Sequence, residues 1–127
     1  MNWTGSAAVC INENNQLLMV LQGKPEEEKK WSVPSGGREA NETYEECCMR
    51  EVLEETGYQI AVKELIFCKN EIVYYYFAEV IGGSAIIQDP DELIYDIAWK
   101  SVEELRNLNL SFEEDREFLI SILEHRH

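Results

Sequence analysis

The segment over residues 36–58, GGREANETYEECCMREVLEETGY, constrains the fold of this chain more than any other part. Thr43 and Glu46 have the spacing of a capping box, in which the hydroxyl and the carboxylate each accept a backbone N–H at the start of a helix. Gly57 follows where such a helix should end, because glycine enters the left-handed conformation without a steric penalty. The pattern therefore predicts a helix over residues 44–56.

The predicted helix has two faces of different chemistry. At about 100° per residue, one stripe is mostly apolar or small, and its members are Cys48, Met49, Val52, Leu53 and Thr56. Glu51, Glu54 and Glu55 fall together on another face, where they repel one another unless a cation bridges them. Oxygen ligands of this kind are what Mg²⁺ prefers, usually one or two carboxylates together with substrate phosphates. A solvated acidic face is the alternative interpretation.

The spacing of the fixed residues favours the metal interpretation. Gly36, five residues, Glu42, seven residues and then REVLEETG over residues 50–57 resembles the Nudix box. This box is the signature of hydrolases that act on nucleoside diphosphates linked to another group. One position departs from it, because Tyr58 stands where the family usually has Ile, Leu or Val. The segment WKSVEEL, residues 99–105, is also similar to a common C-terminal pattern of the family.

The resemblance implies roles for five residues of the chain. The box helix carries the metal ligands in the family, which implicates Glu51 and Glu55 most strongly and then Glu54. The backbone carbonyl of Ser35 would be a further ligand. Arg50 would orient a box glutamate from outside the metal sphere, although ordinary ion pairing on the helix surface is the alternative. We therefore expect Glu51, Arg50 and Glu54 to serve catalysis, with Mg²⁺ as the cofactor and Mn²⁺ as a possible substitute.

The sequence offers more than one candidate for the general base. Glu51 is one candidate, because it is a carboxylate on the metal face. Some Nudix enzymes instead use a carboxylate from a late loop, and here Glu92, Asp96 and Glu103 compete for that role. Glu42 lies just before the helix, where negative charge is favoured by the helix dipole. It would either have that structural role alone or bind an additional cation.

Apolar runs and turn residues predict the elements before the box. Residues 6–11 and 16–22 are apolar runs joined by four polar residues, and they indicate a β-hairpin. Residues 24–30, KPEEEKK, have no apolar anchor and are expected to form a solvated loop. A short strand over residues 31–34 then leads into a flexible turn at residues 34–37.

After the box, further strands are expected at residues 58–68, 71–81, 85–88 and 93–100, with a break at residues 89–91. Ser101 and Glu104 form a second capping box, which opens a helix ending near Asn107. Residues 111–125 have the pattern of an amphipathic helix whose inward side chains are Phe112, Phe118, Leu119, Ile122 and Leu123. Helices that cover both faces of the strands give an α/β/α sandwich with a mixed β-sheet. The resemblance implies the same fold, the Nudix fold.

Composition limits the setting in which the chain acts. A length of 127 residues suits one domain over residues 1–127. The sequence has no apolar run of about 18 residues and no signal-peptide pattern at its start. A net charge of −14 disfavours nucleic-acid backbones and anionic membranes as partners, while bound cations could still admit a phosphorylated substrate. Four cysteines without C-x-x-C spacing indicate free thiols in a reducing cytoplasm, and they are Cys10, Cys47, Cys48 and Cys68.

Two classes of function follow from these patterns. The first is a Mg²⁺-dependent hydrolase that cleaves a pyrophosphate linkage in a small nucleoside diphosphate derivative. The short chain favours a pyrophosphatase of nucleoside triphosphates over a hydrolase of ADP-ribose or nucleotide sugars. The second is a noncatalytic Nudix module that binds a nucleotide as a sensor or regulator. Noncatalytic members commonly lose box glutamates, so the intact set favours the enzyme. The oligomeric state is not predicted.

Overall fold

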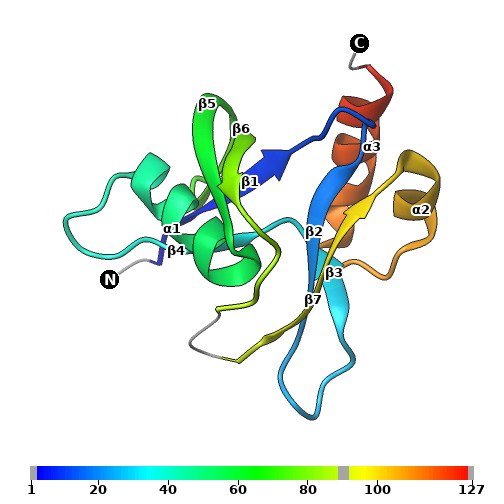
Figure 1. The fold of residues 1–127 in the computed structure, drawn as a ribbon, viewed down its shortest axis with the longest axis horizontal. Helices are drawn as coiled ribbons and strands as arrows, with labels where there is room; N and C mark the ends of the chain where they lie inside the picture. Colours follow the sequence, from blue (N-terminus) through cyan, green and yellow to red (C-terminus); the bar gives the residue numbers. More distant parts are fainter. Residues whose placement is uncertain (1–2, 89–91, 126–127) are drawn as a thin grey trace.

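A computed structural model describes residues 3–88 and 92–125 of the chain. Figure 1 shows their elements in chain order. The first half contains β1 (Gly5–Cys10), β2 (Leu17–Gln22), β3 (Lys30–Ser32), β4 (Ser35–Gly37) and α1 (Tyr44–Thr56). The second half contains β5 (Tyr58–Lys69), β6 (Val73–Gly83), β7 (Ile94–Lys100), α2 (Val102–Asn107), the 3-10 helix η1 (Glu113–Asp115) and α3 (Arg116–Glu124). In this described part, no helix is both long enough and apolar enough to cross a membrane.

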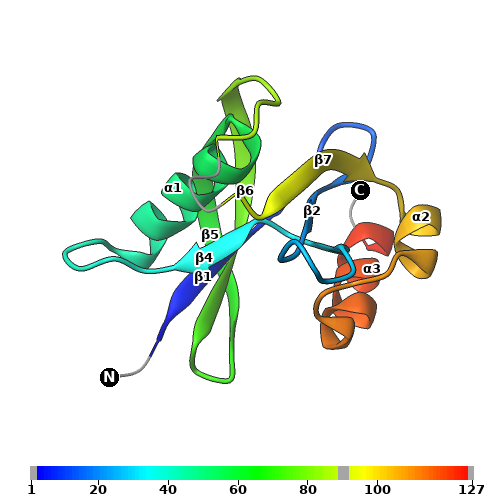
Figure 2. The ribbon, with the colours of Figure 1, turned by 90° about the horizontal axis from the view of Figure 1, so that it is seen from below.

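The strands form two sheets. One is mixed, with the order β4-β1-β6-β5, and in it β1 is antiparallel to β4 and parallel to β6. The other is antiparallel, with the order β3-β2-β7. Figures 1 and 2 show α1 beside the mixed sheet and α2 with α3 beside the second sheet. The mixed sheet with helices on both sides confirms the expected fold class.

Two hydrophobic cores share the strands between the helix layers. Ala7 and Val9 of β1 pack in the core that includes buried residues of α2 and α3. Ala8 and Cys10 pack in the other core, which includes buried residues of α1. Successive side chains of a strand point to opposite faces, so β1 contributes to both cores. This alternation fixes α1 on one side of β1 and the two later helices on the other.

Helix α1 begins and ends where the sequence predicts. Glu46 N–H donates to the Thr43 hydroxyl at 3.0 Å, and Thr43 N–H donates to the Glu46 carboxylate at 2.8 Å. Gly57 has a φ of 80°, and its N–H donates to the carbonyl of Leu53. Both ends are therefore held by local hydrogen bonds, which position the box glutamates along the helix.

The predicted β-hairpin of the first two strands is wrong. β1 and β2 belong to different sheets and meet only at the bridge between Ile11 and Leu17, next to a bond from Asn12 N–H to Gln16 O. β1 pairs with β4 and β6, while β2 pairs with β3 and β7. β4 pairs with Gly5–Ala7 of β1, and β3 pairs with Val20–Gln22 of β2, so these halves of the two strands face other partners rather than each other.

Two short segments, one before and one after helix α1, also differ from the prediction. Residues 35–37, expected to be a flexible turn, form β4 and pair with Gly5–Ala7 of β1. Residues 85–88, expected to be a strand, have no strand assignment. Instead, Ile86 N–H donates to Thr56 O and Gln88 N–H donates to Glu54 O, each at 2.9 Å. These bonds satisfy carbonyls that would be unpaired at the end of α1. The expected break at residues 89–91 lies outside the described residues.

The buried face of α1 is rotated from the expected apolar stripe. Met49 and Leu53 are each 38% exposed, whereas Cys47 and Glu55 are buried. The reason is that α1 packs against β4 as well as against β1 and β5, which brings its Cys47 and Glu55 side inward.

The last helix is also shorter than expected. It starts as η1 and becomes α3 at Arg116, and Phe112 is 43% exposed rather than inward. Leu119 and Leu123 are buried, as the amphipathic pattern predicts.

Candidate functional site

Helix α1 and strand β4 bring the five expected site residues together. Ser35, Arg50, Glu51, Glu54 and Glu55 line one cavity of about 380 Å³. The three glutamates come from successive turns of α1, and Ser35 starts the short strand that lies beside the helix. Side chains at i, i+3 and i+4 lie on one face of a helix, so the spacing alone accounts for their common direction.

The carboxylate of Glu51 lies against the backbone of β4 at Gly36. A Cβ atom on Gly36 would overlap the carboxylate carbon and both oxygens of Glu51. Only glycine leaves this space, so Gly36 and Glu51 form a fitted pair. This contact gives a physical reason for glycine at the first position of the box.

Glu55 is the most buried of the three glutamates, with 6% of its surface exposed. The backbone N–H of Ser35 donates to Glu55 Oε1 at 3.2 Å. A buried carboxylate is costly unless it is hydrogen-bonded, and β4 supplies such a bond. The contact of Ser35 with the box is through its N–H, while the expected role of its carbonyl as a metal ligand stays a prediction.

The guanidinium of Arg50 donates hydrogen bonds to three carboxylates, and a fourth, that of Glu39, has its Oε1 3.6 Å from Arg50 Nε. Arg50 Nε and Nη2 donate to the two oxygens of Glu42 at 2.7 and 3.0 Å. Arg50 Nη1 donates to Glu51 Oε2 at 2.8 Å and to Glu54 Oε1 at 2.9 Å. Arg50 Nη2 also donates to the carbonyl of Gly37 at 2.8 Å. The planar guanidinium is suited to such bidentate geometry, and these bonds orient Glu51 and Glu54 together.

The surroundings of Glu42 and Glu51 shift the pKa values of these two carboxyls in opposite directions. The hydrogen bond from Arg50 holds the pKa of Glu42 below its usual range. Burial raises the pKa of Glu51, although Glu55 and Arg50 oppose that rise. The hydrogen bond to Glu42 also raises the pKa of Arg50, which therefore stays charged. Of these two carboxylates, Glu51 is thus the more basic and the better suited to accept a proton.

The donor set fits a hard divalent cation in its chemistry. Glu51, Glu54 and Glu55 offer only oxygens, which Mg²⁺ prefers over nitrogen and sulfur. Among the described residues, no three Asp, Glu, His or Cys side chains converge on one point. Arg50 lies between Glu51 and Glu54, and Glu55 bonds to Ser35. Each carboxylate has about four lone-pair sites, so a bond to Arg50 or to Ser35 does not use up its capacity to accept.

The late-loop carboxylates lie in different places. Glu92 is exposed, has a φ of 56°, and precedes Leu93 and Ile94, which line the carboxylate cavity. Asp96 is exposed on β7 and accepts the N–H of Ile97 at 2.8 Å. Glu92 is therefore the candidate whose immediate neighbour in the chain lines the carboxylate cavity.

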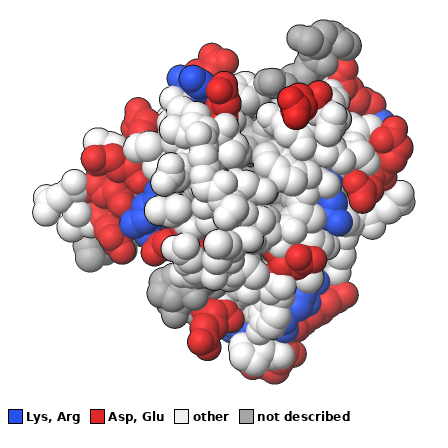
Figure 3. Space-filling model, viewed as in Figure 1, with Lys and Arg blue, Asp and Glu red and all other residues white. Residues whose placement is uncertain are grey.

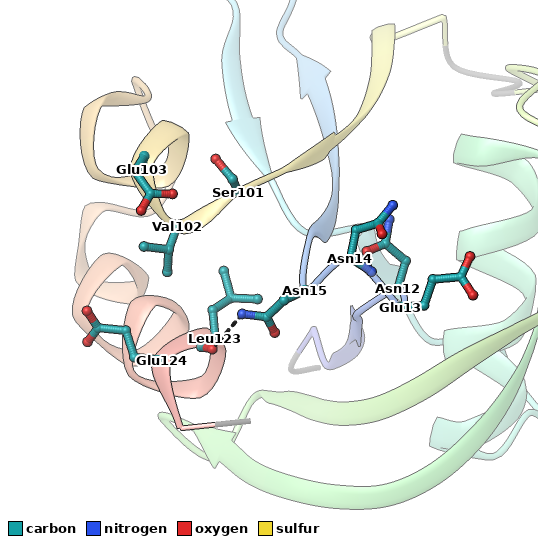
Figure 4. Close-up of a pocket in the computed structure, with 9 residues that line it drawn as sticks. All are labelled: Asn12, Glu13, Asn14, Asn15, Ser101, Val102, Glu103, Leu123 and Glu124. Atoms are coloured by element: carbon teal, nitrogen blue, oxygen red, sulfur yellow. Dashed lines mark hydrogen bonds between the residues drawn. The ribbon is translucent and has the colours of Figure 1, made fainter. Parts of the chain in front are cut away.

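Glu103 lines another cavity, of about 610 Å³, between the turn at residues 12–15 and the helices α2 and α3. Figure 4 shows this cavity, with Asn15 donating to the carbonyl of Leu123 at 2.8 Å. The residues that line it are different from those that line the carboxylate cavity. Glu103 therefore lies apart from the box glutamates.

A third cavity adjoins the carboxylate cavity and is not predicted by the sequence. It measures about 540 Å³ and shares Gln22 and Leu93 with the carboxylate cavity. Lys24, Lys30 and Phe112 also line it. The sequence pattern predicts a solvated loop over residues 24–30 and an inward side chain for Phe112. The available signal was the pair of lysines flanking that loop in a strongly acidic chain.

Comparisons with known proteins identify the family to which this chain is similar. The family model described as NUDIX domain matches residues 1–121. The chain is 30% identical over 112 residues to "Putative nudix hydrolase 1" of Caenorhabditis elegans, a match covering 84% of this chain and 30% of that protein. It is 31% identical over 87 residues to "Putative 8-oxo-dGTP diphosphatase" of Bacillus subtilis, covering 65% of this chain and 56% of that protein. These matches thus span about a third to about half of the relatives' own length.

Solved structures show the same fold. A NUDIX hydrolase from Nitrosomonas europaea superposes with a TM-score of 0.78 at 20% identity, covering 98% of this chain and 89% of that chain. An ADP-ribose pyrophosphatase from Streptococcus suis superposes with a TM-score of 0.76 at 14% identity, covering 100% and 96%. Together with the family match, the mixed sheet and the box helix define a Nudix domain. The chain belongs to the Nudix family.

Proposed function

We propose that residues 1–127 act as a single Nudix hydrolase domain that cleaves a pyrophosphate linkage in a small nucleoside diphosphate derivative. The observation that carries the proposal is the group of Glu51, Glu54 and Glu55 around one cavity, oriented by Arg50. The alternative is a noncatalytic Nudix module that binds a nucleotide. The complete set of box glutamates favours the enzyme.

Mg²⁺ is the proposed cofactor, with Mn²⁺ as a possible substitute. Glu51, Glu54, Glu55 and the carbonyl of Ser35 would hold it beside β4. The bound cation would supply charge neutralisation and Lewis-acid polarisation of the substrate phosphates. A cation is needed because a chain of net charge −14 otherwise repels a polyphosphate.

The side chains of the site have separate proposed roles in the reaction. Glu51 accepts the proton of the attacking water, because burial raises its pKa and its carboxylate is held against Gly36. Arg50 fixes the orientation of that carboxylate through Oε2, and Glu42 holds Arg50 from the other side. Glu54 shares the guanidinium with Glu51 and keeps both carboxylates directed at the cavity. Glu92 is the competing base, because it lies next to residues that line the same cavity.

For the substrate, we propose a nucleoside triphosphate ahead of ADP-ribose or a nucleotide sugar. The relative from Bacillus subtilis, with "8-oxo-dGTP diphosphatase" in its name, supports a triphosphate. Solved neighbours described as an ADP-ribose pyrophosphatase and a UDP-X diphosphatase support the competing classes. The two adjoining cavities suit a substrate with two parts. The phosphates would lie among the glutamates, and the nucleoside would lie in the cavity of Lys24, Lys30 and Phe112.

The proposed partner is this small molecule rather than a nucleic acid or a membrane, and the proposed location is the cytoplasm. In Figure 3, Lys and Arg appear on one face in small groups bordered by Asp and Glu. Nucleic-acid binding surfaces instead have clustered basic residues. All four cysteines are free thiols, which suits a reducing compartment.

A substrate panel with Mg²⁺ tests the proposal directly. The panel contains a deoxynucleoside triphosphate and its 8-oxo form, ADP-ribose, a UDP-sugar and a nucleoside monophosphate, with products separated by chromatography. We expect a triphosphate to be cleaved fastest to a monophosphate and pyrophosphate, and the monophosphate to resist hydrolysis. Calorimetric binding of a nucleotide without turnover of any diphosphate would favour the noncatalytic alternative.

A further inference from the structure

An ion pair outside the carboxylate cavity joins β5 to the start of the last helix. Lys69 Nζ lies 2.9 Å from Asp115 Oδ1 and 3.1 Å from Glu114 Oε2. The hydroxyl of Tyr75 donates to Asp115 Oδ2 at 2.6 Å. Asp115 and Tyr75 are 5% and 2% exposed. We refer to this group as the clamp, and its members are Lys69, Tyr75 and Asp115.

The clamp is not explained by stability alone. Burial raises the pKa of the Tyr75 hydroxyl, which therefore remains a neutral donor to Asp115. Taking a lysine and an aspartate out of water is costly, and packed apolar residues of similar volume are often as stabilising as a buried ion pair. What an ion pair adds over apolar packing is fixed geometry, because its atoms attract only at defined positions.

The clamp fixes the position of Phe112. Lys69 Nζ lies 4.7 Å from the centre of the Phe112 ring, which is the geometry of a cation–π contact. The N–H of Asp115 donates to the carbonyl of Phe112 at 3.0 Å. Both the ring and the backbone of Phe112 are therefore attached to the clamp. Phe112 is 43% exposed and lines the cavity that adjoins the carboxylate cavity.

We propose that Lys69 is a positioning residue, which holds the Phe112 ring as a stacking wall for the nucleobase and so sets the affinity for the nucleoside. This inference rests on the proposed function, because it requires the nucleoside to occupy the cavity that Phe112 lines. Ring faces bind nucleobases by stacking, and a ring held in one orientation loses less entropy on binding. The phosphates lie among the glutamates of α1, so the clamp acts on substrate affinity rather than on the chemical step.

Steady-state kinetics of a mutant cycle test the inference. The variants are Lys69→Met, Phe112→Ala, the double variant and Lys69→Arg, which keeps a cation over the ring. With a nucleoside triphosphate and Mg²⁺, we expect Lys69→Met to raise KM about three- to tenfold, the scale of one cation–π contact. The kcat should stay within about twofold. Phe112→Ala should raise KM at least as much, the double variant no further, and Lys69→Arg should resemble the wild type.

Inorganic triphosphate is the probe that separates positioning from general damage, because it has no base to stack on Phe112. Its KM should be the same in all variants. The matched control is Arg106→Met, which breaks the ion pair of Arg106 with Glu124 between α2 and α3 and should leave both KM values unchanged. Because Lys69→Met leaves the Asp115 charge buried, Lys69→Met with Asp115→Asn provides a second variant without that charge. Its thermal melting curve shows whether it is folded.

Three results would overturn the inference. The first is an unchanged KM in the folded variant that combines Lys69→Met with Asp115→Asn. The second is additivity of the effects of Lys69→Met and Phe112→Ala on KM. The third is an equal rise in KM for inorganic triphosphate. If the wild type cleaves and binds none of the nucleotides, the proposed function fails and this inference fails with it. If the wild type is active while Lys69→Met matches it in KM, the inference alone fails.

Discussion

The carboxylate of Glu51 occupies the space that a side chain on Gly36 would need. Gly36→Ala should therefore push Glu51 away from β4 and disturb its bond to Arg50. A displacement of about 1 Å at a reacting group can cost about 10²-fold in rate, and we expect a loss of that order in kcat. The overall fold should be retained, because β4 is a short edge strand.

Gly82→Ala is the matched control for this change, because a Cβ there meets only the flexible end of the Gln59 side chain. Turnover by the control should match the wild type. Wild-type turnover by Gly36→Ala would show that the close approach of Gly36 and Glu51 has no bearing on the reaction.

The neutral isosteres Glu51→Gln and Glu55→Gln should each lose activity while remaining folded. Removing a positioned base typically costs about 10²–10⁴-fold, and either amide also lacks the charge that a cation requires. The melting temperature of Glu51→Gln should hold or rise, since burial disfavours the charged form of that residue. Glu117→Gln on α3, an exposed position, is the control. Single-turnover rates near the wild-type value in either box variant would contradict the assignment.

The local part of this site could be predicted from the sequence, because a helix and its caps depend on neighbouring residues. Thr43, Glu46 and Gly57 fixed the limits of α1, and the spacing of the glutamates fixed their common direction. The fold, and not the local sequence, gives a reason for Tyr58 at the position where the family usually has Ile, Leu or Val. Trp99 Nε1 donates to the Tyr58 hydroxyl at 3.4 Å, across 41 residues of chain.

The remaining features depend on contacts between distant segments. The strand partners of β1 could not be read from its apolar pattern, which is the same whichever strand lies beside it. The bidentate bonds between Glu42 and Arg50 were not predicted, because Glu42 lies outside the helix and its direction depends on the preceding loop. The clamp was also missed, since Lys69 and Asp115 are 46 residues apart.

Glu42→Gln should destabilise the protein in a pH-dependent way. The pKa of Glu42 is lowered in the folded state by Arg50, so its stabilising contribution is present above the unfolded pKa. That contribution is lost as the pH falls through the folded pKa. The variant should therefore be less stable than the wild type at pH 7, and the difference should shrink as the pH falls into the acidic range in which Glu42 becomes protonated.

Urea denaturation of both proteins between pH 7 and pH 3 measures this difference. Glu104 also has a lowered pKa, through its bonds to Ser101 at the start of α2, and Glu104→Gln serves as a comparison remote from Arg50. A stability difference for Glu42→Gln that is constant across this range would show that its charge is not what holds Arg50.

Mg²⁺ should stabilise the wild-type protein against heat, because a ligand that binds only the folded state shifts unfolding by mass action. At a concentration of about 100 times Kd, the expected gain is about 2.7 kcal/mol in the free energy of unfolding. The gain should vanish in Glu51→Gln and Glu55→Gln and persist in Glu117→Gln, since only the first two remove proposed ligands. Differential scanning calorimetry with Mg²⁺, with Ca²⁺ and with excess chelator measures it without substrate. An equal shift in all four proteins would show that the cation binds elsewhere on the acidic surface. Full turnover in excess chelator would show that the reaction does not require the cation.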